Sequence, residues 1–297
     1  MKKITKRWAA MGLTGAMLLT GLTGCGGSSA QDTAGSGTEA AGAGGPKTLE
    51  IAVLTGMAPY TYVDDAGEFQ GYDYEFLTKV DEKLADYEFH YNSVEPDAAA
   101  AAVQAGTYAL SCSAHFVTPA REKNFTLSIP NCYYPVNLIS RTEDNFKTFE
   151  DLDGAVMVPN PPNDGLYVVL HQMAEQYPDV KFTQEEVSNY VSYADSCRGV
   201  SNGTWDCWFG GDTMFYDVIE QEPMDNLVCS DPITCAPCVV VINKDMTDLR
   251  DAINGAIAEL YEDGTLSTLA DKWLGTDVFA IAEQTGALED YSQYLPA

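Results

Sequence analysis

Two side chains of this 297-residue chain could bind a charged small molecule. Arg121 is one of four arginines after Arg7, and a guanidinium is a planar fork that matches a carboxylate with two parallel hydrogen bonds. It could equally be a surface arginine that pairs with one of the many acids of the chain. Asp212 opens a predicted helix, where an aspartate either caps the helix or faces a ligand.

The cysteines offer a different chemistry. Cys235 and Cys238 form a Cys-x-x-Cys pattern, but a reactive pair normally stands at a helix N-terminus that lowers the thiol pKa. Here the apolar run Val239–Ile242 follows, which predicts a buried strand and disfavours a thiol oxidoreductase. Seven cysteines follow Cys25, an odd number, so both disulfides and free thiols remain open. The histidines show no metal-ligand spacing with them, so we expect no metal and no cofactor.

The first 25 residues predict export and anchoring. A basic start, Met1–Arg7, precedes an apolar run, Trp8–Leu22, that is too short to remain across a bilayer. Leu22–Cys25 resembles a bacterial lipobox, which implies a lipoprotein signal peptide over residues 1–24 and lipidation of Cys25. The alternative is an ordinary secretory signal with an incidental cysteine. Residues 25–47 are rich in Gly, Ser and Ala, which predicts a flexible tether.

The charge of the chain excludes two kinds of partner. Its 44 acidic and 16 basic residues give a formal net charge of −28, and loss of the signal would make it more negative. Such a charge argues against nucleic acid and against electrostatic docking on anionic lipid. No later apolar run is long enough to span a bilayer, so we expect the lipid to be the only membrane attachment.

The elements that must position Arg121 and Asp212 form two similar series of alternating strands and helices. In the first series, the pattern predicts strand, helix, strand, helix and strand at 49–54, 71–85, 87–91, 97–105 and 108–112. In the second, it predicts strands at 156–158, 180–182 and 205–209, with helices at 166–176, 187–198 and 213–220. This alternation predicts two α/β units, each with a parallel sheet.

The C-terminal part decides the topology. One strand at 238–242, a helix at 246–261 and a short helix ending at Gly275 are too few for a third domain, so they should return to the first unit. The chain then crosses twice, near residues 132–135 and 235–239, which makes a hinge with a ligand cleft beside it. We therefore predict lobe 1 at 48–134 plus 236–275 and lobe 2 at 135–235. Whether the tail, 276–297, packs on lobe 1 or stays loose is open.

At this point the chain resembles the family 3 extracellular solute-binding proteins, which deliver amino acids and related solutes to ABC transporters. The order and spacing of seven motifs between residues 49 and 275 carry the resemblance: Pro59–Tyr62, Gly71–Glu75, Ser113–Arg121, Phe149–Gly154, Gly203–Asp212, Glu262–Leu266 and Lys272–Gly275. It implies an α/β fold of the periplasmic-binding-protein-like type II class, in which two Rossmann-like lobes are joined by a two-strand hinge.

The resemblance also implies site residues. The arginine that matches Arg121 holds the α-carboxylate of the ligand, and the aspartate that matches Asp212 accepts the α-ammonium from the opposite lobe. Together they would clamp a zwitterion and couple its binding to closure. Ser113 and Ala114 match positions that meet the head group of the ligand. The wall of the pocket is implied to include Met57 and Tyr60.

Several departures from the family limit this transfer. Phe116 stands where the family usually has Ser or Thr, which leaves only its backbone N–H for a carboxylate. Pro161–Pro162 replaces a Gly-Thr pair that donates N–H groups, and proline has no N–H. Asn163 or Asp164 would have to substitute, and Asp164 would repel an anion. Leu54 replaces the acid found in binders of cationic amino acids, so we expect an apolar pocket and a ligand that is not cationic.

The resemblance therefore implies a substrate-binding lipoprotein of an ABC importer. It would bind an amino acid or related zwitterion and pass it to permease subunits on the outer face of the cytoplasmic membrane, or in the periplasm of a two-membrane source. The alternative is a secreted enzyme on the same scaffold, similar to cyclohexadienyl dehydratase, which needs a tuned acid or base. His115 matches a position that points into the lobe, so we expect no enzyme. A chemosensory module is a third possibility, but the sequence shows no transducing helix, so sensing would have to be indirect.

Overall fold

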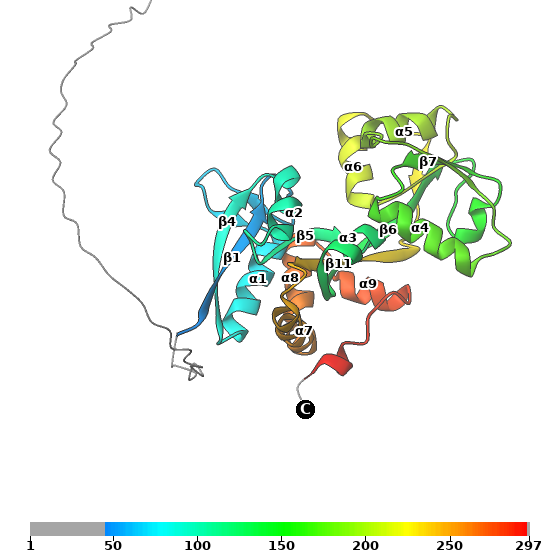
Figure 1. The fold of residues 1–297 in the computed structure, drawn as a ribbon. Coiled ribbons are helices and arrows are strands. Elements are labelled where there is room, and N and C mark those ends of the chain that lie inside the picture. The colour runs from blue at the N-terminus through cyan, green and yellow to red at the C-terminus, as the bar shows by residue number, and fades with distance from the viewer. Residues whose placement is uncertain (1–44, 296–297) are drawn as a thin grey trace, which may run out of the picture. The chain divides into compact units, whose positions relative to one another are not determined.

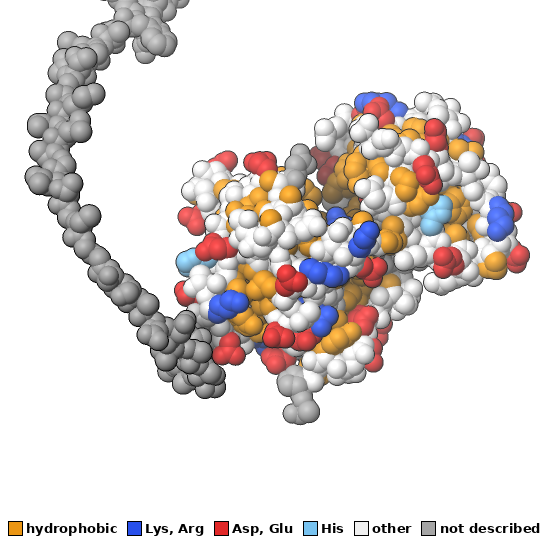
Figure 2. All heavy atoms as spheres, in the orientation of Figure 1, with side chains coloured by type: hydrophobic (Ala, Val, Ile, Leu, Met, Phe, Trp, Pro, Cys, Tyr) orange, Lys and Arg blue, Asp and Glu red, His pale blue; other side chains and the backbone are white. Residues whose placement is uncertain are grey.

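The computed structural model describes residues 45–295. The predicted signal peptide, Cys25 and nearly all of the predicted tether lie outside the described residues. Between residues 45 and 295, the longest apolar helices fall short of what a membrane crossing requires. Acidic side chains are scattered over the face shown in Figure 2, as the net charge leads one to expect.

Lobe 1 begins with three parallel strands. These are β1 (Lys47–Leu54), β4 (Tyr87–Val94) and β5 (Leu110–Phe116), in the order β4-β1-β5. The helices α1 (Tyr72–Lys83) and α2 (Pro96–Gln104) connect them, and a short hairpin, β2 (Tyr62–Val63) with β3 (Phe69–Gln70), precedes α1. Because the apolar residues of α1 recur on one face, they are buried against the sheet. The predicted alternation is confirmed here.

Two long strands join the lobes. β6 (Thr126–Arg141) and β11 (Thr234–Ile242) run antiparallel to each other, with Cys132 opposite Cys238. β11 also pairs with β5 of lobe 1, whereas the end of β6 pairs with β9 of lobe 2. One path, β4-β1-β5-β11-β6-β9-β7-β8, therefore runs through both lobes (Figure 1). The two predicted crossings lie side by side on these strands.

Lobe 2 repeats the parallel arrangement. Its strands β7 (Val156–Asn160), β8 (Thr183–Glu186) and β9 (Cys207–Gly210) are parallel, and β10 (Leu227–Cys229) pairs with β6. A 3-10 turn, η1 (Phe149–Leu152), precedes β7. The helices are α4 (Gly165–Gln176), α5 (Tyr193–Ser201) and α6 (Asp212–Gln221), with α4 in one apolar core and α5 and α6 in another.

Two predicted elements of lobe 2 were misplaced. Residues 187–192 are not helical, and α5 begins only at Tyr193, because Ser192 has an extended backbone and its hydroxyl accepts a hydrogen bond from the Asp195 amide at 3.1 Å. This side chain caps the helix and stops it from extending backward. The short strand predicted at 180–182 lies instead at 183–186. The irregular segment 187–192 carries Tyr190, which lines the cavity described below.

The C-terminal elements pack in the core of lobe 1. They are α7 (Thr247–Glu262), α8 (Thr265–Leu274), α9 (Val278–Gln284) and the 3-10 turn η2 (Tyr291–Tyr294). The tail packs on lobe 1 as far as residue 295, because Val278, Phe279 and Tyr291 are buried in the lobe 1 core. This answers the question that the sequence left open. Tyr291 stacks on Tyr261 with ring centroids 4.3 Å apart.

Candidate functional site

Arg121 lies on α3 (Pro119–Asn124), directly after β5. Thr118 caps this helix, since its hydroxyl accepts a hydrogen bond from the Arg121 amide at 3.2 Å. The guanidinium turns back toward the strand, and its Nη1 donates to the Phe116 carbonyl oxygen at 2.7 Å. A guanidinium has five N–H donors, so this contact orients the group and leaves donors for a ligand.

The charge of Arg121 has no paired acid in residues 45–295. Ion pairs join each of the other three arginines in this range, at positions 141, 198 and 250, to a carboxylate at 2.6 to 2.7 Å. Burial lowers the pKa of Arg121, and attractions from Tyr190 and Asp164 partly oppose that effect. A half-buried guanidinium without a paired anion is costly, so an anion supplied by a ligand would be bound favourably.

The end of β5 places two predicted site residues beside Arg121. Ser113 is buried, and its hydroxyl shares a 2.8 Å hydrogen bond with Thr61, so it supports the strand end. Ala114 lines the cavity with a φ of 47°, a left-handed conformation that costs a non-glycine residue about 1–3 kcal/mol. The Asp73 carboxylate holds this conformation by accepting a hydrogen bond from the Ala114 amide at 2.8 Å.

A cavity of about 500 Å³ lies between the lobes. Lobe 1 contributes four residues that we predicted for the site: Met57, Tyr60, Ala114 and Phe116. The rest of the wall is mainly apolar and aromatic, and its principal members are Tyr134, Leu166, Tyr190, Tyr193, Trp208 and Met214. Tyr193 stacks on Trp208 with centroids 5.7 Å apart. Small-molecule sites typically combine such a wall with a few polar groups.

Asp164 is an acidic group in this wall that we did not assign to the site. It caps α4, since its Oδ1 accepts hydrogen bonds from the Leu166 and Tyr167 amides at 2.9 and 3.1 Å. One sequence signal could have identified it. Asp164 follows the carboxyl end of β7, and ligands of parallel α/β sheets bind at the carboxyl ends of the strands.

The structure places Asp212 and Asn163 outside this cavity's lining. Asp212 is half-buried and lines a second cavity of about 330 Å³, which shares Tyr60, Tyr134 and Met214 with the first. Its Oδ1 accepts a hydrogen bond from the Thr213 amide at 2.6 Å. Asn163 is exposed. Arg121 and Ser113 are also absent from the lining of the first cavity, and Arg121 is connected to its wall through the hydrogen bond to the Phe116 carbonyl oxygen.

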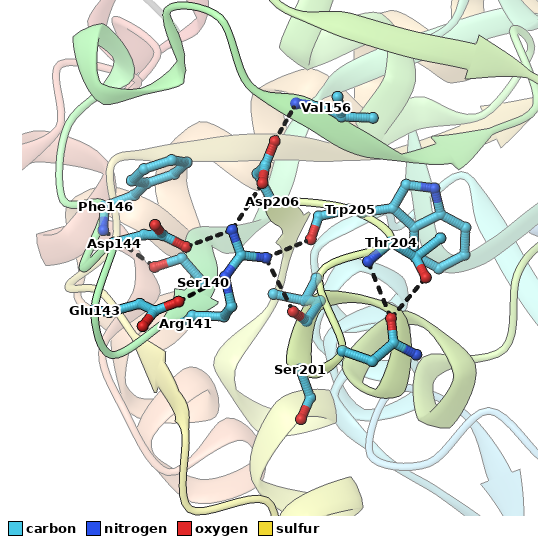
Figure 3. A network of polar contacts seen from close by, with 12 residues as sticks. Ser140, Arg141, Glu143, Asp144, Phe146, Val156, Ser201, Thr204, Trp205 and Asp206 are labelled. Carbon is cyan, nitrogen blue, oxygen red and sulfur yellow. Dashed lines mark hydrogen bonds and ion pairs between the residues drawn. The ribbon is translucent and has the colours of Figure 1, made fainter.

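A second arginine shows what a fully satisfied guanidinium looks like in this fold. Arg141 donates to the Asp206 carboxylate at 2.7 Å and to the carbonyl oxygens of Val200 and Trp205, and it pairs with Asp144 at 2.7 Å (Figure 3). The hydrogen bond to Asp206 is the largest cause of its raised pKa. Because these donors are used within lobe 2, Arg141 has a structural role.

The thiols and the histidine beside the site are packed rather than poised for reaction. The seven cysteines between residues 45 and 295 are free, and Cys235 and Cys238 lie on β11, as predicted for a buried strand. Burial raises the pKa of Cys235 to about 11. His115 is bonded to Ser111 at 3.1 Å, and burial lowers its pKa to about 3, so it is neutral at pH 7. No set of three or more potential metal-ligating side chains gathers within residues 45–295.

Comparisons with known proteins agree with this architecture. A family model described as bacterial extracellular solute-binding proteins, family 3, matches residues 49–276. The L-cystine-binding protein TcyK of Bacillus subtilis is 25% identical over 250 residues, which cover 82% of this chain and 90% of that protein.

Two solved structures are similar in fold. The probable amino-acid ABC transporter extracellular-binding protein YtmK of Bacillus subtilis has a TM-score of 0.59 at 20% identity, covering 77% of this chain and 98% of that one. An ABC uptake transporter substrate-binding protein of Streptococcus pneumoniae with bound histidine has a TM-score of 0.54 at 19% identity, covering 78% and 94%. The predicted fold, two Rossmann-like lobes of the type II class joined by a two-strand hinge, is confirmed.

Proposed function

Because the chain belongs to family 3 of the bacterial extracellular solute-binding proteins, we propose that it is the substrate-binding lipoprotein of an ABC importer. It captures an amino acid or a related small zwitterion in the cleft between its lobes and delivers it to permease subunits without chemical change. The lipid on Cys25 anchors it to the outer face of the cytoplasmic membrane, or within the periplasm of a two-membrane source. The names of its relatives, which include L-cystine-binding and amino-acid ABC transporter-binding proteins, support this class of ligand.

The observation that carries the proposal is the guanidinium of Arg121, which is half-buried without a paired acid in residues 45–295 and is hydrogen-bonded to Phe116, a residue of the apolar cavity wall. Arg121 takes the carboxylate of the ligand, and an acid of lobe 2 takes its ammonium; the resemblance implies Asp212 for that second role. Lobe closure then requires both ends of the ligand, because each lobe supplies one contact. The aromatic wall favours an apolar or aromatic side chain over a cationic one.

A thermal-shift screen of the standard amino acids and L-cystine tests this function, since a ligand that binds only the native state raises its melting temperature. We expect a shift with at least one zwitterion and its loss in Arg121→Ala. Arg250→Ala is the matched control, because Arg250 pairs with its neighbour Asp251 and lines a different cavity. A screen without any shift, or a shift that survives in Arg121→Ala, would contradict the proposal.

The anchor has a separate test. Replacement of Cys25 by serine should release the protein from membranes into the soluble fraction of the source cells, while ligand binding by the purified protein stays unchanged. Retention of Cys25→Ser in the membrane fraction would rule out lipidation at this residue.

A further inference from the structure

The cavity between the lobes contains an acid whose position suits a ligand better than that of Asp212. The ammonium and carboxylate of an α-amino acid are attached to the same carbon, so the groups that bind them must lie within a few ångströms of each other. Asp164 lines the cavity that also contains Phe116, to whose carbonyl oxygen Arg121 is bonded. Asp212 lines the second cavity.

The Asp164 carboxylate is held in place with one oxygen uncommitted to the helix. Its Oδ1 accepts both hydrogen bonds from the first turn of α4, at 2.9 and 3.1 Å, and these bonds fix the direction of the side chain. Tyr190, on the irregular segment before α5, borders the same space, and its pKa is raised by burial and then by the Asp164 charge. A fixed carboxylate beside aromatic side chains is a favourable place for an ammonium group.

The same edge of lobe 2 is unsuited to an anion. Pro161 and Pro162 have no N–H to offer, and the Leu166 and Tyr167 amides are already bonded to Asp164. Gly165 packs so closely against Phe116 of lobe 1 that the Cβ of any other residue would overlap the phenylalanine side chain. The Phe116 ring therefore covers the start of α4, and the charged group at this helix end is the Asp164 carboxylate.

We propose that Asp164, in place of Asp212, receives the ammonium group of the ligand, so that Arg121 and Asp164 select a zwitterion whose apolar side chain fills the aromatic cavity. This inference rests on the proposed function and narrows its substrate to amino acids with bulky apolar or aromatic side chains. The positive group comes from lobe 1 and the negative group from lobe 2, as closure on a zwitterion requires.

Calorimetric titration with L-phenylalanine, 3-phenylpropanoate and 2-phenylethylamine tests the assignment, because the second probe lacks the amine and the third lacks the carboxylate. Asparagine keeps the helix cap while removing the charge, so Asp164→Asn should fold normally. We expect it to weaken phenylalanine binding roughly ten- to hundredfold, the value of a hydrogen bond to a charged group, without weakening that of 3-phenylpropanoate. Arg121→Ala should weaken the binding of 3-phenylpropanoate but not that of 2-phenylethylamine.

The matched control is Asp277→Asn. Asp277 caps α9 by accepting hydrogen bonds from two amides, as Asp164 does on α4, but it lies outside the cavity lining. Phenylalanine affinity should be unchanged in this variant.

Three outcomes would overturn the inference. If Asp212→Asn weakens phenylalanine binding more than Asp164→Asn does, the ammonium site is Asp212 and the proposed function stands. If the wild-type protein binds a polar or charged amino acid but none with a bulky apolar or aromatic side chain, the apolar substrate class is wrong. If it binds no amino acid at all, the proposed function fails together with this inference.

Discussion

Arg121 and Arg141 are similar in sequence context but have opposite roles, and the difference lies in their surroundings. Arg121 lies on the short helix that follows β5, and Arg141 is the last residue of β6. Arg141 donates hydrogen bonds to the Asp206 carboxylate and to two carbonyl oxygens of lobe 2, it forms ion pairs with Asp144 and Glu143, and its pKa is raised. Arg121 is bonded to one carbonyl oxygen, and burial lowers its pKa.

This contrast distinguishes an arginine that stabilises the fold from one that awaits a ligand. A guanidinium whose donors are satisfied internally contributes to stability in the absence of any ligand. A guanidinium that is desolvated without an anion costs stability, and a bound carboxylate recovers that cost. Opposite effects on unfolding and on binding are therefore expected when the two residues are changed.

The largest expected effect is on stability. Arg141→Ala should lower the free energy of unfolding by about 2–3 kcal/mol, because its side chain is 16% exposed and its loss leaves the Asp206 carboxylate without a cation, bonded only to the Val156 amide. Urea denaturation measures this change. Arg198→Ala serves as the control, since its pairs with Asp195 and Glu222 are exposed and should matter much less. If both variants lose the same free energy of unfolding, the contacts of Arg141 stabilise the fold no more than an exposed ion pair does.

A smaller effect is expected in binding. Arg121→Lys keeps a positive charge but loses the planar fork, so it should weaken a carboxylate ligand about tenfold, or about 1.4 kcal/mol. The free energy of unfolding without ligand should stay within about 0.5 kcal/mol of the wild type, because lysine keeps the desolvated positive charge at this position. Isothermal titration with the best ligand of the thermal-shift screen measures the first quantity. Unchanged affinity would mean that no bidentate contact exists.

The smallest effect concerns pH and the support of Ala114. Burial raises the pKa of Asp73 to about 6, against hydrogen bonds from Ala114, Cys112 and Asn131 that lower it. Because this pKa lies above the ordinary aspartate value of 3.8, the native state holds the proton more tightly than the unfolded state does. The contribution of Asp73 to stability should therefore rise by about 1 kcal/mol as the pH falls from about 7 to about 5.

Denaturation of the wild type and of Asp73→Asn across this pH range isolates that contribution, since the amide does not titrate. The difference between their free energies of unfolding should grow in favour of the wild type on acidification. Parallel pH profiles would show that Asp73 is ionised throughout the range.

Much of the fold was predictable because it follows from local patterns. The apolar faces of α1 and α7 and the apolar strands β1 and β11 are apparent from spacing alone. The predicted helix at 187–198 was wrong over its first six residues, because a single serine cap outweighed the general helical pattern. The tail could not be placed, since its few apolar residues are buried only by contact with lobe 1.

Composition, periodicity and motif order are local properties of the chain. They were therefore enough to predict two α/β units, the return of the chain to the first unit and Arg121 as a candidate ligand-binding residue. The folded molecule was needed to show that Asp164 and Phe116, the residue to which Arg121 is bonded, line one cavity, whereas Asp212 lines a neighbouring one. Electrostatic partners are selected by distance in space, and the charge of Asp164 acts on Arg121 although β6 carries the chain from one lobe to the other between them.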